Sequence, residues 1–209
     1  MNTPTILAAL NAVQAAIQAA EPDIESLDRA IGDGDHFINV SRGCEVIAAM
    51  QEELAPLPPA QAFQKIGMKL LSTIGGASGP LISSLFLAMG KSLEGVPEPD
   101  RRQFAAAFSA GVDAIRSRGK ADLGEKTMLD VLIPVSRLLL RLTADDTPLA
   151  TLCPRLVEEA ERGMLATRDM IATKGRASFL GERAIGHIDP GSKTSAVAIA
   201  AVCSMLTAA

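Results

Sequence analysis

Three aspartates lie close together near the beginning of the chain, in a stretch rich in glycine. Asp33 and Asp35 stand two residues apart in IGDGDH, and Asp28 lies five residues upstream. Carboxylates this close repel one another unless a cation joins them. Hard oxygen ligands without cysteine favour Mg²⁺, Mn²⁺ or Ca²⁺ over Zn²⁺, and Mg²⁺ commonly shares its coordination between carboxylates and phosphates. The alternative is a solvated turn in which Asp35 is the N-cap of a helix.

Two histidines and two arginines also lie in glycine-rich stretches. His36 and His187 are the histidines of the chain, and either can hydrogen-bond a phosphate or transfer a proton. The aspartates beside His36 favour a phosphate contact there, whereas the sequence is neutral for His187. Arg176 and Arg183 flank SFLGE in a long connection near the C-terminus. This connection either folds over a ligand or is a surface loop with salt bridges, and its length favours a function.

The elements that must position these residues are helices. Apolar residues recur with helical spacing, and no stretch shows sustained strand alternation. We therefore expect one all-α domain over residues 1–209, built of up-and-down helices. The eight expected helices span about residues 3–20, 36–53, 59–73, 79–93, 100–118, 128–144, 148–173 and 192–207.

The connections between these helices alternate between two kinds. Those after the second, fourth and sixth helices are proline-rich: APLPP, GVPEPD and ADDTP. The others are rich in glycine or charge: LDRAIGDGD, TIGGASGP, GKADLGEKT and TKGRASFLGERAIGHIDPGSK. In an up-and-down arrangement this second kind shares one end with four helix N-termini, whose free N–H groups suit the phosphates of a nucleotide. Thr127 with Asp130 fits a capping box at one of them.

Composition argues against several classes of protein. The net charge is −4 without a basic cluster, which disfavours nucleic-acid binding. Three scattered cysteines without a CxxC pair are typical of buried apolar side chains in a reducing compartment. The uncharged stretch 70–90 is interrupted by IGGASGP, and the uncharged stretch 194–209 is shorter than the ~20 residues of a membrane span. We expect a soluble, cytoplasmic protein with no membrane partner.

Four stretches in order carry a resemblance to a known family. IGDGDH, GGASGP, GKADLGEKTMLDVL and GRASFLGERAIGHIDPGS resemble the nucleotide-binding (L) subunit of dihydroxyacetone kinases, and the match extends over essentially the whole chain. The resemblance implies a closed barrel of eight antiparallel helices with ADP or ATP at one end. It also implies two Mg²⁺ ions, which bridge the nucleotide phosphates. The implied site residues are Asp28, Asp33 and Asp35 for the metals, His36, Asn39 and Ser78 for the phosphates, and Gly76, Gly119, Thr127, Met128, Arg176, Asp189 and Gly191 for the adenine pocket and its lid.

The same resemblance implies phosphoryl transfer to a short-chain ketose such as dihydroxyacetone. The ketose is bound by a separate K subunit, which these residues do not resemble. The phosphate comes either from ATP that exchanges with ADP or from a phosphohistidine protein (M subunit) of the sugar phosphotransferase system that rephosphorylates bound ADP. A separate chain favours the second source.

Two alternatives stay open at this point. Phe37 stands where the family often has glycine, which leaves a related tetrulose kinase, acting on erythrulose, as an alternative. A hypothesis of another class is a regulatory subunit that binds ADP and Mg²⁺ and docks on a transcription regulator without turnover of its own.

Overall fold

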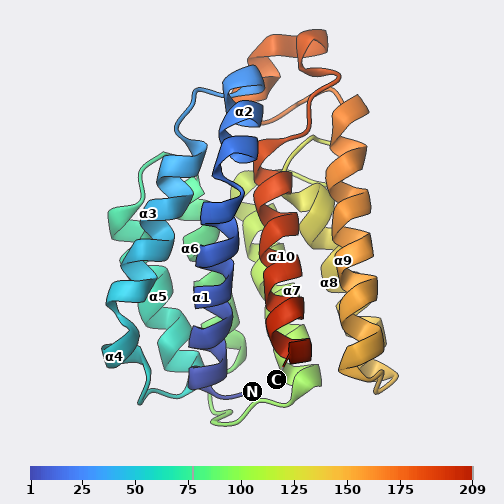
Figure 1. The fold of residues 1–209 in the computed structure, drawn as a ribbon. Coiled ribbons are helices and arrows are strands. Elements are labelled where there is room, and N and C mark those ends of the chain that lie inside the picture. Colours follow the sequence, from blue (N-terminus) through green and yellow to red (C-terminus); the bar gives the residue numbers. More distant parts are fainter. Residues whose placement is uncertain (77, 209) are drawn as a thin grey trace.

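The structure is a computed structural model that describes residues 1–76 and 78–208. Within these ranges it contains ten α-helices, two 3₁₀-helices and no β-strand (Figure 1). The predicted all-α class is therefore confirmed for the described residues. The elements are α1 (Thr3–Ala19), α2 (Glu21–Ile31), α3 (His36–Ala49), α4 (Gln51–Leu54), α5 (Pro59–Thr73), α6 (Ser78–Ser92), α7 (Arg101–Gly119), α8 (Leu129–Ala144), α9 (Leu149–Ala166), η1 (Thr167–Asp169), η2 (Arg176–Ala184) and α10 (Pro190–Ala208).

The long helices pack against their neighbours in chain order. From α5 to α10 each helix contacts the next, α10 contacts α1, α1 contacts α3, and α3 contacts α5. Both termini lie at one end of the molecule, which also carries the proline-rich connections and is called the proline end (Figure 1). The opposite end, called the loop end, carries residues 32–35, 74–76, 120–128 and 167–189. The predicted separation of the two kinds of connection is therefore found in the described chain.

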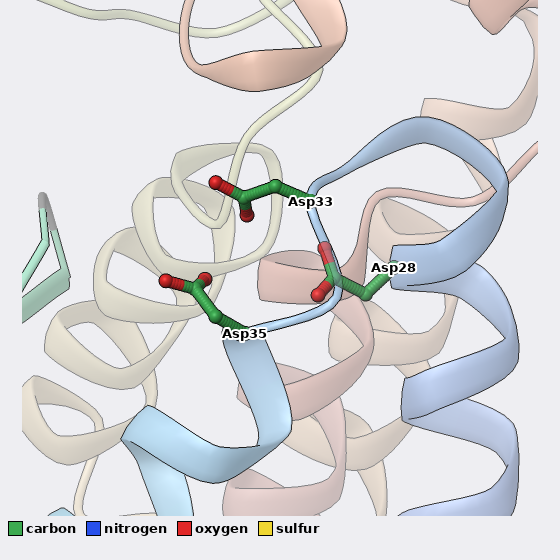
Figure 2. A group of neighbouring side chains, drawn as sticks. All are labelled: Asp28, Asp33 and Asp35. Atoms are coloured by element: carbon green, nitrogen blue, oxygen red, sulfur yellow. The ribbon is translucent and has the colours of Figure 1, made fainter.

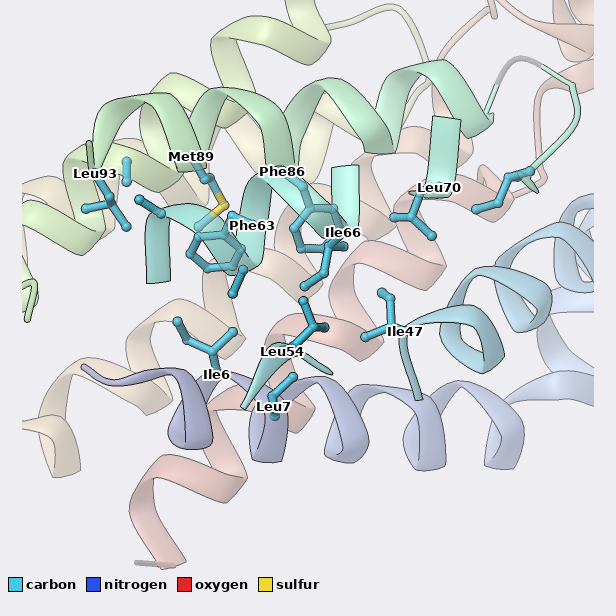
Figure 3. Close-up of a cluster of buried hydrophobic side chains, with 14 residues drawn as sticks. Ile6, Leu7, Ile47, Leu54, Phe63, Ile66, Leu70, Phe86, Met89 and Leu93 are labelled. Carbon is cyan, nitrogen blue, oxygen red and sulfur yellow. The ribbon is translucent and has the colours of Figure 1, made fainter. Parts of the chain in front are cut away.

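The largest buried cluster joins α1, α3, α4, α5 and α6 (Figure 3). Leu54, Ile66, Leu70 and Leu93 are its most deeply buried large side chains, each at most 1% exposed. Each helix contributes side chains spaced three or four positions apart, so one face of the helix is buried. Inner helix faces also line an apolar cavity of about 380 Å³, which extends from His36 at the loop end to Leu149 at the proline end.

The cysteines are free, as the sequence predicted. Cys153 and Cys203 are buried, and Cys44 is partly buried. Burial raises the pKa of the Cys44 thiol to about 11 and that of Cys203 to about 12. These thiols therefore stay protonated and serve as small apolar side chains.

The segment after the first helix is helical, so the expectation of a connection from about residue 21 is wrong. Residues 21–31 form α2. Pro22 stands in its first turn, where the missing N–H costs nothing, and Glu21 and Asp23 suit the positive end of the helix dipole. Ile24 and Ile31 are buried on one face. This helix carries Asp28 up to the loop end.

The expectation that the seventh helix extends to residue 173 is also wrong. α9 ends at Ala166, and η1 follows. Lys126 Nζ donates to the Thr167 carbonyl at 2.5 Å, the oxygen to which the Ile171 N–H would bond if the helix continued. The competing donor comes from a segment 41 residues away, so no local pattern reveals it.

The last helix begins two residues earlier than expected, at Pro190. The Asp189 carboxylate accepts the Ser192 N–H at 2.6 Å, and thus caps it. Among the described helices, α10 is long and apolar enough to cross a membrane by length and composition alone. In this fold it packs against α1, α2, α8 and α9.

Gly163 allows α9 to approach the first turn of α8, which carries part of the loop end. A Cβ at this position would collide with the Asp130 backbone oxygen and lie 3.1 Å from the Val131 Cα. Alanine favours helix over glycine by about 1 kcal/mol. We nevertheless expect Gly163→Ala to lower the free energy of unfolding by about 1–3 kcal/mol, measured by urea denaturation. The control is Gly75→Ala, where a Cβ meets no described atom within 4 Å, and unchanged stability of Gly163→Ala would contradict the backbone collision.

Candidate functional site

The three aspartates come together at the loop end (Figure 2). One carboxylate oxygen from each of Asp28, Asp33 and Asp35 lies within 4.8 Å of the other two. Asp28, in the last turns of α2, is buried, whereas the other two are exposed in the turn before α3. Three carboxylates at this spacing match the oxygen donor set of a hard divalent cation. They are called the aspartate cluster below.

Two glycines allow this turn to form. A side chain at Gly32 would collide with the Asp28 carboxylate, and Gly34 has a φ of +81°, which favours glycine. Asp28 Oδ2 also accepts the His36 N–H at 2.9 Å and thereby caps the start of α3. Asp35 stands at the N-cap position of α3, as the alternative expected, but its side chain makes no capping hydrogen bond.

The charge of the aspartate cluster is partly met by an arginine from the connection before α10. This connection, residues 170–189, is called the lid. Partial desolvation of the exposed Asp35 carboxyl, together with the neighbouring Asp33, raises its pKa. Arg176 Nε, from the lid, lies 2.7 Å from Asp33 Oδ2. Both partners are exposed, so this pair adds little stability, but it places the lid directly on the aspartate cluster.

The lid is attached to the rest of the loop end in two ways. Ala172, Ala177 and Ala184 bury their side chains with Ile31 of α2 in a small apolar cluster. Polar contacts reach the connection between α7 and α8, where Thr173 Oγ1 donates to Glu125 Oε1 at 2.7 Å. The lid is therefore an ordered part of the fold instead of a free surface loop.

The residues expected at the phosphates lie beside the aspartate cluster. His36 Nε2 is 2.8 Å from Thr194 Oγ1 on α10, and burial lowers the His36 pKa despite the neighbouring carboxylates. Asn39 is 7% exposed on α3. Gly76, which was expected at the adenine pocket, also lies beside this group: it has a φ of +67°, and a Cβ there would lie 3.9 Å from Asn39 Nδ2. Ser78 begins α6 and lines the same cavity as His36 and Asn39.

Several of the residues expected at the adenine pocket lie close to one another at the loop end. A Cβ on Gly191 would lie 3.6 Å from Met128 Cβ and 3.1 Å from Asp189 Oδ2. Gly119 ends α7 and approaches Leu81 of α6, whose Cδ2 would be 3.3 Å from a Cβ at position 119. Leu81 and Met128 pack against one buried cluster, so these positions share one wall of the loop end.

Thr127 and Asp130 fix the start of α8. The Asp130 carboxylate accepts the N–H groups of Thr127 at 2.7 Å and Gly124 at 2.5 Å. Thr127 Oγ1 accepts the Leu129 N–H at 3.2 Å. The predicted capping box is therefore only half formed: Asp130 accepts the Thr127 N–H, but the Thr127 hydroxyl accepts the N–H of residue 129, whereas a capping box would use that of residue 130.

Four helix N-termini open onto the same cavity. His36 at the start of α3, Ser78 at the start of α6, Met128 before α8 and Gly191 at the start of α10 all line it. Each start presents the positive end of a helix dipole, although side chains of this chain already accept the N–H groups of His36, Leu129 and Ser192. Next to them stands the aspartate cluster, so the arrangement suits a polyanion that arrives together with a divalent cation.

Three further residues considered in the sequence analysis do not point toward the aspartate cluster or the cavity. Phe37 is buried with Ile17 and Ile24 in the core, so this departure from the family pattern does not add a bulky group to the site. The exposed Arg183 donates to the Leu180 carbonyl of its own lid at 3.4 Å. His187 is exposed, and its backbone oxygen accepts the Lys126 ammonium at 2.5 Å.

Sequence reasoning missed Lys126. It is 1% exposed, yet it follows Glu125 in a charged connection where a lysine normally lies in solvent. Burial lowers its pKa, against the charges of nearby carboxylates. No signal in the sequence indicates this burial.

Comparison with known proteins decides the family. The family model described as the DAK2 domain matches residues 30–204. This chain belongs to the DAK2 domain family. The predicted resemblance is thereby confirmed for most of the chain.

Two relatives have a length similar to that of this chain. It is 39% identical to the PEP-dependent dihydroxyacetone kinase 1, ADP-binding subunit DhaL, of Listeria innocua, over 87% of this chain and 85% of that protein. It is 41% identical to the PTS-dependent dihydroxyacetone kinase, ADP-binding subunit DhaL, of Lactococcus lactis, over 86% of this chain and 85% of that protein.

A solved structure shares the fold of the DAK2 protein. The dihydroxyacetone kinase of C. freundii in complex with AMP-PNP and Mg²⁺ matches with a TM-score of 0.74 and 27% identity. The match covers 95% of this chain and 33% of that one. The C. freundii chain therefore carries a large part that the DAK2 protein does not match.

Asp189 gives the DAK2 protein a testable pH dependence. Burial raises its pKa from 3.8 to about 7, although the N–H groups of Ser192 and Gly191 act in the opposite direction. Between these two values the folded state keeps a proton that the unfolded state has released, so the stability contributed by this group is lost as pH rises. We expect Asp189→Asn to remove this component, so that the Tm of the unaltered chain falls relative to that of the variant from about pH 4 to about pH 7.

Circular dichroism melts without nucleotide measure this difference. Asp113→Asn, at an exposed aspartate of α7, is the matched control. Parallel Tm curves for the unaltered chain and Asp189→Asn would contradict the raised pKa.

Proposed function

We propose that this chain is the nucleotide- and Mg²⁺-binding subunit of a dihydroxyacetone-type kinase, which passes a phosphoryl group to a short-chain ketose held by another subunit. The observation that carries this proposal is the aspartate cluster beside four helix N-termini on one cavity. Carboxylates repel phosphates, whereas helix N-termini attract them. A metal–nucleotide complex suits both features, because its cation binds the carboxylates and its phosphates lie at the helix N-termini. The names of the relatives, ADP-binding subunits of dihydroxyacetone kinases, support this choice of ligand.

The aspartate cluster is the proposed metal site, with two Mg²⁺ ions as the resemblance implies. Its donor set fits, because Asp28, Asp33 and Asp35 each direct an oxygen to a shared space and carboxylate oxygens suit Mg²⁺. Bound Mg²⁺ neutralises charge on the phosphates during transfer. The chain's own part is to hold the aspartates in place, which the turn at Gly32 and Gly34 does.

The remaining residues are proposed to hold and orient the nucleotide. His36, Asn39 and Ser78 contact phosphates, and the positive ends of the α3 and α6 helix dipoles attract them. The adenine side is formed by Gly76, Gly119, Thr127, Met128, Arg176, Asp189 and Gly191. A neutral His36 ring, favoured by its lowered pKa, orients a phosphate through a hydrogen bond without adding a full charge.

Two partners are proposed for the reaction. A ketose-binding K subunit brings the acceptor hydroxyl to the terminal phosphate, since phosphoryl transfer depends mainly on positioning and charge neutralisation. A phosphohistidine M subunit rephosphorylates ADP that stays bound. The names of relatives of similar length, PEP-dependent or PTS-dependent, favour this donor over exchange with ATP.

The architecture proposed for this function is a closed barrel of eight antiparallel helices forming one domain over residues 1–209. The contact of α10 with α1, and the chain-order contacts from α5 to α10, support the closed arrangement. In this arrangement, the short helices α2 and α4 belong to the connections from α1 to α3 and from α3 to α5, at opposite ends of the barrel. A cytoplasmic location, expected from the sequence, stays a prediction.

ADP should bind to this chain only together with a divalent cation. Without a cation the aspartate cluster repels the phosphates. Isothermal titration with ADP in Mg²⁺ and in EDTA measures this requirement. Asp33→Asn should weaken binding in Mg²⁺ by about 100-fold or more, since even the loss of an outer-shell partner costs 10- to 100-fold at metal sites.

The matched control is Asp23→Asn, which removes the same charge from the exposed first turn of α2. Helical circular dichroism should be the same for all three proteins, because Asp33 lies in an exposed turn. Equal ADP affinity in Mg²⁺ and EDTA would refute the proposed function.

The lid should form part of the surface that meets the K subunit. Phe179, at 82% exposure, lies on the lid three residues from Arg176, and exposed aromatic side chains are common anchors of interfaces. Phe179→Gln should lower ketose phosphorylation with a K subunit by about 10-fold through weaker association and leave ADP affinity unchanged.

The control for this change is Met68→Gln, because Met68 is also exposed, at 57%, but lies in the middle of α5. The assay should include dihydroxyacetone and erythrulose, with ATP and with a phosphohistidine donor, and each protein alone. Ketose phosphorylation by the purified chain with ATP alone would contradict the proposed division between subunits.

A further inference from the structure

The connection between α7 and α8 contains a lysine that is sealed inside the protein. Lys126 is 1% exposed, and its φ is +60°. An ammonium group taken out of water is costly unless its donors are satisfied. The hydrogen bonds of the Lys126 ammonium therefore indicate its role in the structure.

The Lys126 ammonium joins the two ends of the lid. Nζ donates to the Thr167 carbonyl at 2.5 Å, just before the lid, and to the His187 carbonyl at 2.5 Å, near its end. Two other contacts close the same place: the Gly186 N–H donates to the Arg168 carbonyl at 2.8 Å, and the Asp189 N–H donates to Thr167 Oγ1 at 3.0 Å. These contacts are called the neck of the lid.

The segment that carries Lys126 is itself fixed from α8. Asp130 accepts the N–H groups of Gly124 and Thr127, on either side of the lysine. The carboxylates of Asp189, Asp169 and Asp130 offset the cost of burying the ammonium. The contacts at the neck therefore run from α8 through Lys126 to both ends of the lid.

We propose that Lys126 is a positioning residue that closes the neck of the lid and thereby retains the bound nucleotide. Lys126 acts through other residues. The neck holds the ends of the lid, from which Arg176 contacts the aspartate cluster, and it fixes Asp189 before the start of α10. The apolar cluster on α2 holds the middle of the lid, whereas Lys126 holds its two ends. This inference rests on the proposed function, because it assigns the lid to a nucleotide.

Lys126→Met in the full chain tests the inference, because methionine keeps much of the side-chain length and removes the charge and all donors. The matched control is Lys120→Met, at an exposed lysine of the same connection with a φ of +47°. Hydrogen–deuterium exchange of the Gly186 and Asp189 amides reports the neck. The rate of ADP dissociation in Mg²⁺ measures retention of the nucleotide, and the affinity for Mn²⁺ without nucleotide tests whether the aspartate cluster is intact.

Lys126→Met should speed exchange at the neck and ADP dissociation by about 10- to 100-fold, as expected for losing hydrogen bonds from a charged donor. Mn²⁺ affinity should stay within about 2-fold, because the aspartate cluster contains no contact to the lysine, and such selectivity would not accompany general unfolding. Lys120→Met should change none of these. Unchanged neck exchange or unchanged ADP dissociation in Lys126→Met would overturn the inference.

Thr167→Val provides a second variant if Lys126→Met does not fold. It removes the hydroxyl that accepts the Asp189 N–H without leaving a buried charge, and should speed neck exchange and ADP dissociation by about 3- to 10-fold. No change in either rate would overturn the inference. If the unaltered chain does not bind ADP with Mg²⁺, the proposed function fails, whereas neck exchange without nucleotide still tests whether Lys126 closes the lid.

Discussion

The mutual repulsion of three carboxylates is the constraint around which the loop end is organised. Asp28 is held by the N–H of His36, Asp33 is paired with Arg176, and Gly32 leaves room for the Asp28 carboxylate. Each of these contacts comes from a different element: the start of α3, the lid, and the turn between α2 and α3. The carboxylates therefore form the oxygen donor set of the proposed metal site, and the helix N-termini beside them attract the phosphates of the proposed nucleotide.

The lid uses two kinds of interaction for two purposes. Its middle rests on α2 through small apolar side chains, which are non-directional contacts that tolerate sliding. Its base is held by hydrogen bonds from a buried ammonium, which are directional and costly to leave unmade. Under the proposed function, an element held in this way adjusts over the nucleotide while its ends stay fixed.

Comparison with longer relatives gives the loop end its setting. This chain covers 33% of the C. freundii dihydroxyacetone kinase, which therefore carries a further part on the same chain, whereas relatives of matching length are named as subunits. Under the proposed function, a ketose-binding partner contacts the loop end, where Phe179 is exposed. A separate subunit must recognise this surface each time it binds, whereas a fused domain is held nearby at high effective concentration.

The sequence by itself determined the all-α class, the gathering of the glycine-rich connections at one end and the aspartate cluster. These follow from local periodicity, from the alternation of the connections and from the short spacing between Asp33 and Asp35. Tertiary structure alone decided where α9 ends, because the carbonyl of Thr167 is taken by a lysine distant in sequence. It also decided that Phe37 packs into the core and that Lys126 is buried. Side-chain burial depends on which elements meet in space, and spacing along the chain does not encode that.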